Sequence, residues 1–383
     1  MFVKDISAEE ILFFIIYGIT GAVSLMAALY LLLRRGNAFA PDVTPPVRLR
    51  RWAASFFVAA SLGHVWWYLF LIYSCDIQSA YYVVVSVVDC FGMLTTISGT
   101  LLAMLQDRKR PVWPVVAALI PYPLIGAFYI VHPNIHYLYI AIAYILLLYA
   151  IFTVYMVFAV RRYERWLNDN YADLENKKVW LSQVVSLVCL LLFILYTTVE
   201  TDGIMIFILH VVELILFGLL LWRVETLPNL KTHPQPLPCR EGSDYSQDQE
   251  QTDELSTPLA IARGIGSEAL AQIEQLLAEH CVDTQLYLQH DLTLQQLAQT
   301  IGTNRYYLSQ YFSRQGITYN TYINNLRINH FINRYQELAA TGQPIVAQQL
   351  ASESGYRSYS TFSLAFKQRT GQTVTAWMRE SAE

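Results

Sequence analysis

Long apolar runs separated by short polar segments fill the chain up to about residue 222, and the pattern then changes. A membrane-spanning helix needs roughly 20 apolar residues to cross about 30 Å of hydrocarbon. Seven runs meet this length: Ile11–Leu33, Trp52–Tyr73, Ala80–Leu105, Pro111–Val131, His136–Val160, Val179–Val199 and Gly203–Trp222. The pattern predicts an all-α chain that begins with a seven-helix transmembrane bundle over residues 1–223.

Basic residues concentrate in every second connecting segment. Segments 34–51, 106–110 and 161–178 together hold thirteen Lys or Arg, whereas the opposite segments and the N-terminus hold only Lys4. Cytoplasmic connections are the ones enriched in Lys and Arg. We therefore predict a multi-pass protein of a bacterial inner (cytoplasmic) membrane, with its N-terminus outside and its C-terminal region in the cytoplasm.

Four polar side chains interrupt the apolar runs: His64, Asp89, His210 and Glu213. A carboxylate at the centre of a span costs about 2.5–3.5 kcal/mol on insertion scales, so these groups should face the bundle interior. His210 and Glu213 are three residues apart and share a helix face. Two interpretations stay open: a sensor pocket for a ligand or a proton, or interhelical hydrogen bonds that only stabilise the bundle.

Residues 224–262 differ from both flanking regions. Prolines at positions 228, 234, 236 and 238 and a polar, acidic run from Glu241 to Glu254 leave too little apolar surface for a core. We predict a flexible cytoplasmic linker here. Helical periodicity returns after Gly266, with an amphipathic helix over about 267–281 that opens a third region at 263–383.

Two short helices joined by a glycine turn are predicted next. Thr293 and Gln296 have the spacing of a capping box at the start of the first helix. Gly302 ends that helix, and Thr303 is placed to cap a second one over Asn304–Arg314. A short helix, a glycine turn and a second helix together are typical of a helix-turn-helix unit.

The same pattern recurs later in the chain. Gly355 follows Ala351 by four residues, as Gly302 follows Ala298, and a second helix is predicted over about Ser358–Arg369. A single match would be weak, but two in tandem favour a repeated unit.

A long helix is predicted between the two units, over about Tyr319–Leu338. Its length of roughly 30 Å is close to one turn of DNA, about 34 Å. The two reading helices are therefore expected to enter successive major grooves on one face of a duplex.

The segment GYRSYSTFSLAFKQRTG, Gly355–Gly371, has a glycine–aromatic pair, Ser, Phe, Phe-Lys and Thr-Gly in that order. In this it resembles the signature of the AraC family of transcription regulators, and Leu326-Arg327-Ile328 resembles that family's linker-helix motif. The resemblance covers about residues 266–383. Val374 stands where a proline is usual and Phe331 where an alanine is typical, and we expect both to alter packing more than recognition. The membrane half resembles membrane-anchored variants with several spans rather than the family's sugar-binding barrel.

The resemblance implies which side chains read bases. These positions fall on Arg305, Tyr306, Ser309 and Gln310 in the first unit and on Tyr359, Ser360, Ser363 and Leu364 in the second. Gln suits the edge of adenine and Arg that of guanine. The two tyrosines can contact thymine methyl groups or phosphates, or be packed aromatic residues. Leu364 is a poor base reader, so weak sequence preference is expected from the second unit.

Composition and charge agree with this division. The chain is 54% hydrophobic and 15% charged, which is too apolar for an ordinary soluble protein. The net charge of −4 averages two unlike halves, but residues 301–379 hold eight Lys or Arg against two acids, an excess that favours a polyanion. We predict phosphate contacts by Arg327, Arg357, Lys367 and Arg369; the alternative for each is a solvated charged face.

No catalytic residues, cofactor or metal site are predicted. The five cysteines form no CxxC pair and have no histidine cluster nearby, which argues against zinc and thioredoxin-type sites. We therefore predict a non-enzymatic, membrane-anchored, sequence-specific DNA-binding transcription regulator that senses an unidentified signal ligand. Its expected partners are double-stranded promoter DNA, the lipid bilayer and RNA polymerase, with a homodimer as one assembly. The alternative is an integral-membrane receptor or transporter whose helical tail binds a protein.

Overall fold

The computed structural model describes residues 8–34, 36–72, 80–198, 203–230 and 267–381. These residues form helices and turns and contain no β-strand, so the predicted all-α class is confirmed for them. The chain divides into two compact units, one made of Met1–Tyr163 and Asn176–Thr232, the other of Glu164–Glu175 and His233–Glu383.

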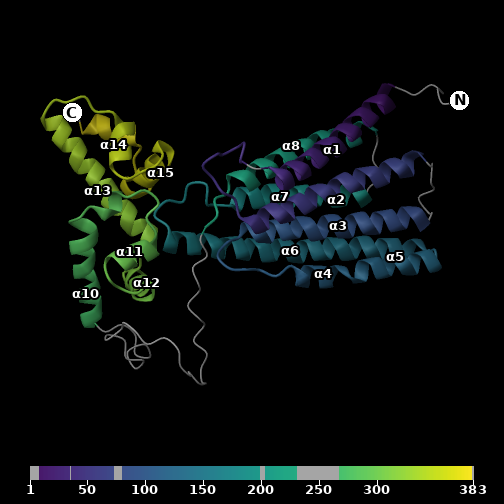
Figure 1. The fold of residues 1–383 in the computed structure, drawn as a ribbon, viewed down its shortest axis with the longest axis horizontal. Helices are drawn as coiled ribbons and strands as arrows, with labels where there is room; N and C mark the ends of the chain where they lie inside the picture. Colours follow the sequence, from purple (N-terminus) through teal and green to yellow (C-terminus); the bar gives the residue numbers. More distant parts are fainter. Residues whose placement is uncertain (1–7, 35, 73–79, 199–202, 231–266, 382–383) are drawn as a thin grey trace, which may run out of the picture. The chain divides into compact units, whose positions relative to one another are not determined.

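The first unit is a bundle of long helices. Its elements are α1 (Ala8–Leu33), α2 (Val47–Ile72), α3 (Ala80–Met104), α4 (Trp113–Leu119), α5 (Pro121–Val131), most of α6 (Ile135–Asn170), α7 (Trp180–Thr198) and α8 (Gly203–Thr226). Figure 1 shows them running alongside one another. α1 packs against α2 and α8, α2 against α3, and α7 against both α3 and α8, so these five helices close a ring.

Five of the described helices are long and apolar enough to cross a membrane: Ile11–Leu33, Ala80–Met104, Trp113–Val131, Ile135–Asn170 and Phe207–Thr226. They coincide with five of the seven predicted spans. α2 and α7 are helical at the other two predicted positions but are not among these five, so the count of seven stays a prediction. Large apolar side chains such as Met26, Leu33 and Phe158 are exposed on the outside of the bundle. Such a surface suits lipid better than water.

Two spans differ from their predicted form. The run Pro111–Val131 is divided into α4 and α5, and the second of these begins at Pro121, whose ring cannot donate the backbone hydrogen bond that a continuous helix needs. α6 continues ten residues past the predicted end at Val160, to Asn170. At 1.5 Å per residue its 36 residues reach about 54 Å, well beyond the thickness of the hydrocarbon core.

The predicted linker, residues 224–262, begins with residues that pack on the first unit. Glu225 is fully buried and lies 2.9 Å from the guanidinium of Arg34 in an ion pair. Leu227 and Leu230 are buried as well. The chain that leaves α8 is therefore attached to the end of the bundle, and most of the remaining linker prediction falls outside the described residues.

The second unit contains a series of shorter helices. They are α10 (Ser267–Leu277), a π-helical turn η1 (Ala278–Val282), a 3₁₀ turn η2 (Leu286–Leu288), α11 (Leu294–Thr300), α12 (Arg305–Arg314), α13 (Tyr319–Ala340), α14 (Ala347–Glu353), α15 (Tyr359–Thr370) and α16 (Val374–Glu380). The predicted capping box of Thr293 and Gln296 is present at the start of α11. The predicted cap of α12 at Thr303 is wrong: the side chain of Asn304 accepts from the backbone N–H of Tyr306 instead.

Each pair of short helices encloses its own apolar core, and α13 contributes to both. In the first core Ile323 of α13 packs with Leu297 and Phe312. In the second, the ring of Phe331 lies 4.5 Å from that of Phe362 and 5.7 Å from that of Phe366, measured between centroids. The bulky Phe331 is therefore a central packing residue, as expected from its position.

Arg327 lies on α13 between the two cores and corrects a prediction. Its side chain is only 1% exposed. Nε donates to the carbonyl of Tyr287 and Nη2 to that of Gln289, both at 2.7 Å, and the guanidinium lies over the ring of Tyr356. Burial lowers the pKa of this guanidinium. Because the side chain is buried, and Nε and Nη2 donate inside the protein, the structure assigns Arg327 a structural role in place of the predicted phosphate contact.

Replacing Arg327 by Met should lower the free energy of unfolding of a 264–383 fragment by roughly 2–5 kcal/mol, because two buried carbonyls lose their charged donor. Urea unfolding followed by circular dichroism measures this. The control is Arg334→Met, which removes an exposed ion pair with Glu337 and should cost under about 1 kcal/mol. Equal losses for the two variants would contradict the assigned role of Arg327.

Candidate functional site

The outer face of α12 carries the predicted base-reading residues of the first helix-turn-helix unit. Leu308 and Phe312 are buried on its inner face. Tyr306 and Ser309 are exposed, and Tyr306 keeps 44% of its surface accessible, so it is not a packed core aromatic. The turn before α12 passes through Gly302, whose positive φ of +70° favours glycine.

The second helix-turn-helix unit repeats this arrangement on α15. Phe362 and Phe366 face the core, while Tyr359, Ser360 and Leu364 are exposed and Ser363 is half-buried. Its turn passes through Gly355, with φ +86°, where a Cβ would lie 2.8 Å from the carbonyl oxygen of Leu288. This close approach excludes any residue larger than glycine. It places the turn of the second helix-turn-helix unit directly against η2.

The three other predicted phosphate contacts are on the surface. Lys367 is exposed on α15. Arg357 is exposed and lies 3.5 Å from Asp291 in a solvent-accessible ion pair. Arg369 is exposed and donates to the backbone carbonyl of Asn325 and the side chain of Asn329 on α13. Exposed pairs of this kind are worth little and can exchange for a phosphate.

A short segment, Glu164–Glu175, packs within the second unit; we call it the docking segment. Ala172 is buried in the first core, and its N–H donates to the carbonyl of Leu292 at 3.2 Å. Nδ2 of Asn320 on α13 donates to the carbonyls of Tyr171 at 3.1 Å and Ala172 at 2.7 Å. The segment is thus fixed to the first helix-turn-helix unit through its backbone.

The docking segment also meets the first turns of both exposed helices. The guanidinium of Arg305, at the start of α12, donates to Oδ1 of Asn170. Burial there lowers the pKa of Arg305. On α15 the hydroxyl of Thr361 donates to the carboxylate of Glu175 at 3.3 Å. One predicted base-reading residue, Arg305, is therefore held by a side chain of the protein itself.

A family model described as a helix-turn-helix domain matches residues 297–380. The match spans both helix pairs and α13, and it supports an AraC-type helix-turn-helix domain and a DNA-binding regulatory role for this region. A search of curated proteins and a search of solved structures each found no match.

The four polar residues predicted inside the spans line one cavity in the first unit. The cavity has a volume of about 90 Å³, and His64, Asp89, His210 and Glu213 all border it. They come from three helices, α2, α3 and α8. The hydrophobic pattern could show that each should face inward, but not that they meet.

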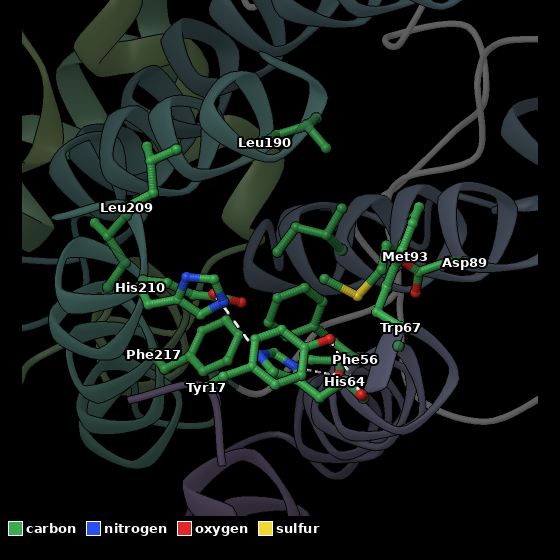
Figure 2. A pocket seen from close by; sticks show the side chains of 15 residues that line it. Tyr17, Phe56, His64, Trp67, Asp89, Met93, Leu190, Leu209, His210 and Phe217 are labelled. Atoms are coloured by element: carbon green, nitrogen blue, oxygen red, sulfur yellow. Dashed lines mark hydrogen bonds and ion pairs between the residues drawn. The ribbon is translucent and has the colours of Figure 1, made fainter. Parts of the chain in front are cut away.

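Aromatic groups missed by the sequence analysis hold these residues in place. Figure 2 shows the rings of Tyr17, His64 and His210 together. The ring centroid of Tyr17 lies 4.7 Å from that of His64 and 5.2 Å from that of His210. Nε1 of Trp67 donates to the Asp89 carboxylate at 3.2 Å. In an apolar run, Tyr and Trp look like packing or interfacial residues, so the sequence held no signal for these contacts.

Removal of the Asn320 amide tests what the docking segment does. We expect Asn320→Ala in the full chain to raise affinity for DNA roughly twofold to tenfold, because two hydrogen bonds of about 0.5–1.5 kcal/mol each no longer hold the segment beside Arg305. Gel shifts with the full chain in lipid nanodiscs measure this.

The matched control is the same substitution in a 264–383 fragment, which lacks the segment. There Asn320→Ala should leave DNA affinity unchanged. A loss of affinity in both proteins would mean that Asn320 serves the DNA interface and not the docking segment.

Proposed function

We propose that the protein is a membrane-anchored, sequence-specific DNA-binding transcription regulator that senses a signal through its membrane unit. The observation that carries this proposal is the pair of helix-turn-helix units with polar outer faces on α12 and α15, joined to a bundle whose helices can span a membrane. The family match over residues 297–380 supports the DNA-binding part.

The proposed interface uses α12 and α15 as reading helices. α13 has 22 residues and is about 33 Å long, close to the roughly 34 Å between successive major grooves on one face of DNA. Arg305 and Gln310 offer donors suited to guanine and adenine. Ser360, Ser363 and Leu364 offer fewer donors for base edges. We therefore propose that the first helix-turn-helix unit supplies most of the sequence preference.

The membrane unit is proposed to span a bacterial inner membrane seven times, with the N-terminus outside. The bias of Lys and Arg toward alternate connections supports this topology. The cavity around His64 and His210 is the proposed signal site. Promoter DNA, the bilayer and RNA polymerase are the proposed partners, and a homodimer would raise the effective concentration of paired reading helices.

Coupling between signal and DNA is proposed to act through the docking segment. In the described conformation Asn170 engages Arg305, so this side chain must leave Asn170 before it can contact a base. A signal that favours the released segment would therefore favour DNA binding. This is a population shift between two states, and it needs only a difference of a few kcal/mol in their free energies.

Two single substitutions separate base reading from phosphate contact. Gln310→Ala should cost about 1–3 kcal/mol on the best-bound sequence and relax the preference at one base pair. Lys367→Ala should weaken binding to all sequences about equally and reduce the slope of log affinity against log salt by about 1. Selection from genomic fragments with the full chain in nanodiscs, followed by gel shifts, measures both effects.

Arg334→Ala, which removes an exposed side chain paired with Glu337 on α13, is the control and should change affinity less than about twofold. The proposed function would be overturned if neither the full chain nor the protein fragment 264–383 selected any genomic DNA.

A further inference from the structure

Three side chains of the membrane cavity have the composition and spacing of a metal site. The imidazoles of His64 and His210 and the carboxylate of Glu213 each offer one ligand atom, and these atoms lie within 4.8 Å of one another. His210 and Glu213 are on one face of α8, and His64 is on α2, which packs against α8. Two imidazoles and one carboxylate form a common ligand set for zinc and other first-row divalent metals.

Binding a metal requires the three ligand atoms, now within 4.8 Å of one another, to come closer together. Nε2 of His64 is 4.0 Å from Oε2 of Glu213. Bonds of about 2.0–2.1 Å in tetrahedral geometry hold donor atoms roughly 3.3 Å apart, so closure of this pair is about 0.7 Å. Side-chain rotations can supply movement of this size for the His64–Glu213 pair, and closure of up to about 1.5 Å for any pair at the 4.8 Å limit.

The protonation of His64 is set for metal binding. Nδ1 lies 2.8 Å from the carbonyl oxygen of Ala60, so in the neutral ring it carries the proton and donates it. Nε2 then presents its lone pair, and it is buried without a hydrogen-bond partner among the described residues. Histidines that bind metals commonly donate their other ring N–H to a backbone carbonyl in this way.

Charge in the cavity favours a divalent cation. Asp89 and Glu213 can supply two negative charges, and among the described residues that line the cavity none is a lysine or an arginine. Unbalanced carboxylates inside a bilayer are unfavourable. A divalent ion with neutral imidazoles balances both charges. The volume of about 90 Å³ leaves room for a water molecule as a fourth ligand.

We propose that the first unit binds one divalent first-row transition metal ion, with Zn²⁺ the best match, through His64, His210 and Glu213. Imidazole ligands favour this class over Mg²⁺ and Ca²⁺, which prefer oxygen. Metal binding stands on the geometry alone; its use as a signal rests on the proposed function. Tyr17, whose ring packs in a tilted arrangement against both imidazoles, is a positioning residue for the site.

The test uses the full chain in lipid nanodiscs, stripped with a chelator and titrated with Zn²⁺ against a chromophoric competitor. We expect one ion per chain. Glu213→Gln and His210→Ala should each weaken binding 10- to 100-fold or more, whereas His136→Ala, which removes an exposed histidine outside the cavity, should leave it unchanged. Co²⁺ in place of Zn²⁺ should give the intense visible absorption of a tetrahedral site, a readout that needs no variant.

Each outcome bears on one claim. Substoichiometric binding, equal affinity in Glu213→Gln and wild type, or a Co²⁺ spectrum typical of six oxygen ligands would overturn the metal site. DNA gel shifts on the same samples, with and without Zn²⁺, are read separately. If DNA affinity is unchanged when the site is filled, the metal site is supported but the metal is excluded as the signal. If no DNA binding is found under either condition, the proposed function is overturned and the metal site is not affected.

Discussion

The arrangement of the second unit depends on the hydrogen bonds that the buried guanidinium of Arg327 donates to the backbone carbonyls of Tyr287 and Gln289. α13 can set the distance between the two helix pairs, but a helix shared by two small cores does not by itself fix how the second pair is rotated about it. Arg327 adds two charge-assisted hydrogen bonds to the backbone around η2 and a contact with Tyr356 in the turn between α14 and α15. Gly355 lets the backbones approach closely at this point. Together they fix the second helix pair against the region that precedes the first.

A second constraint governs the first unit, whose helices are apolar enough to cross a membrane: polar groups inside an apolar bundle must find partners within the protein. At one end of the bundle Arg34 pairs with Glu225, and Asp107 pairs with Arg110 at 2.6 Å, although Nε of both arginines and Oε1 of Glu225 have no hydrogen-bond partner among the described residues. In the cavity, Nε2 of His64 likewise has no hydrogen-bond partner in the described part of the chain, but here the unpartnered atom borders an open volume. An incompletely paired polar cavity in an otherwise apolar bundle is where a ligand gains most from binding.

Local signals in the sequence predicted much of the second unit. The capping box at Thr293, the glycine turns, and the apolar spacing around Phe362 depend only on neighbouring residues, and the structure confirms them. The cap at Asn304 was misassigned by one position because Thr303, directly before it, is also of a residue type that caps helices. Arg327 was misread as a phosphate ligand because a basic residue in a basic region carries no local mark of burial.

Contacts between distant parts of the chain could not be predicted in this way. In the sequence, the docking segment has the pattern of an ordinary charged connection. Only the fold brings Asn170 to Arg305, and places Ala172 in a core formed by residues more than a hundred positions later in the chain. The same holds for His64 and His210, which the pattern could turn inward but not bring together. Helix ends at Val160 and Trp222 were set too early because hydropathy falls before the helices end.

The most direct test of the central claim, that two rigidly spaced helices read one face of a duplex, is a hydroxyl-radical footprint. The full chain in nanodiscs would be bound to its highest-affinity DNA fragment and the protected positions mapped on both strands. The account predicts two protected segments centred about 10 base pairs apart on the same face of the helix. A single protected segment, or two segments on opposite faces, would contradict it.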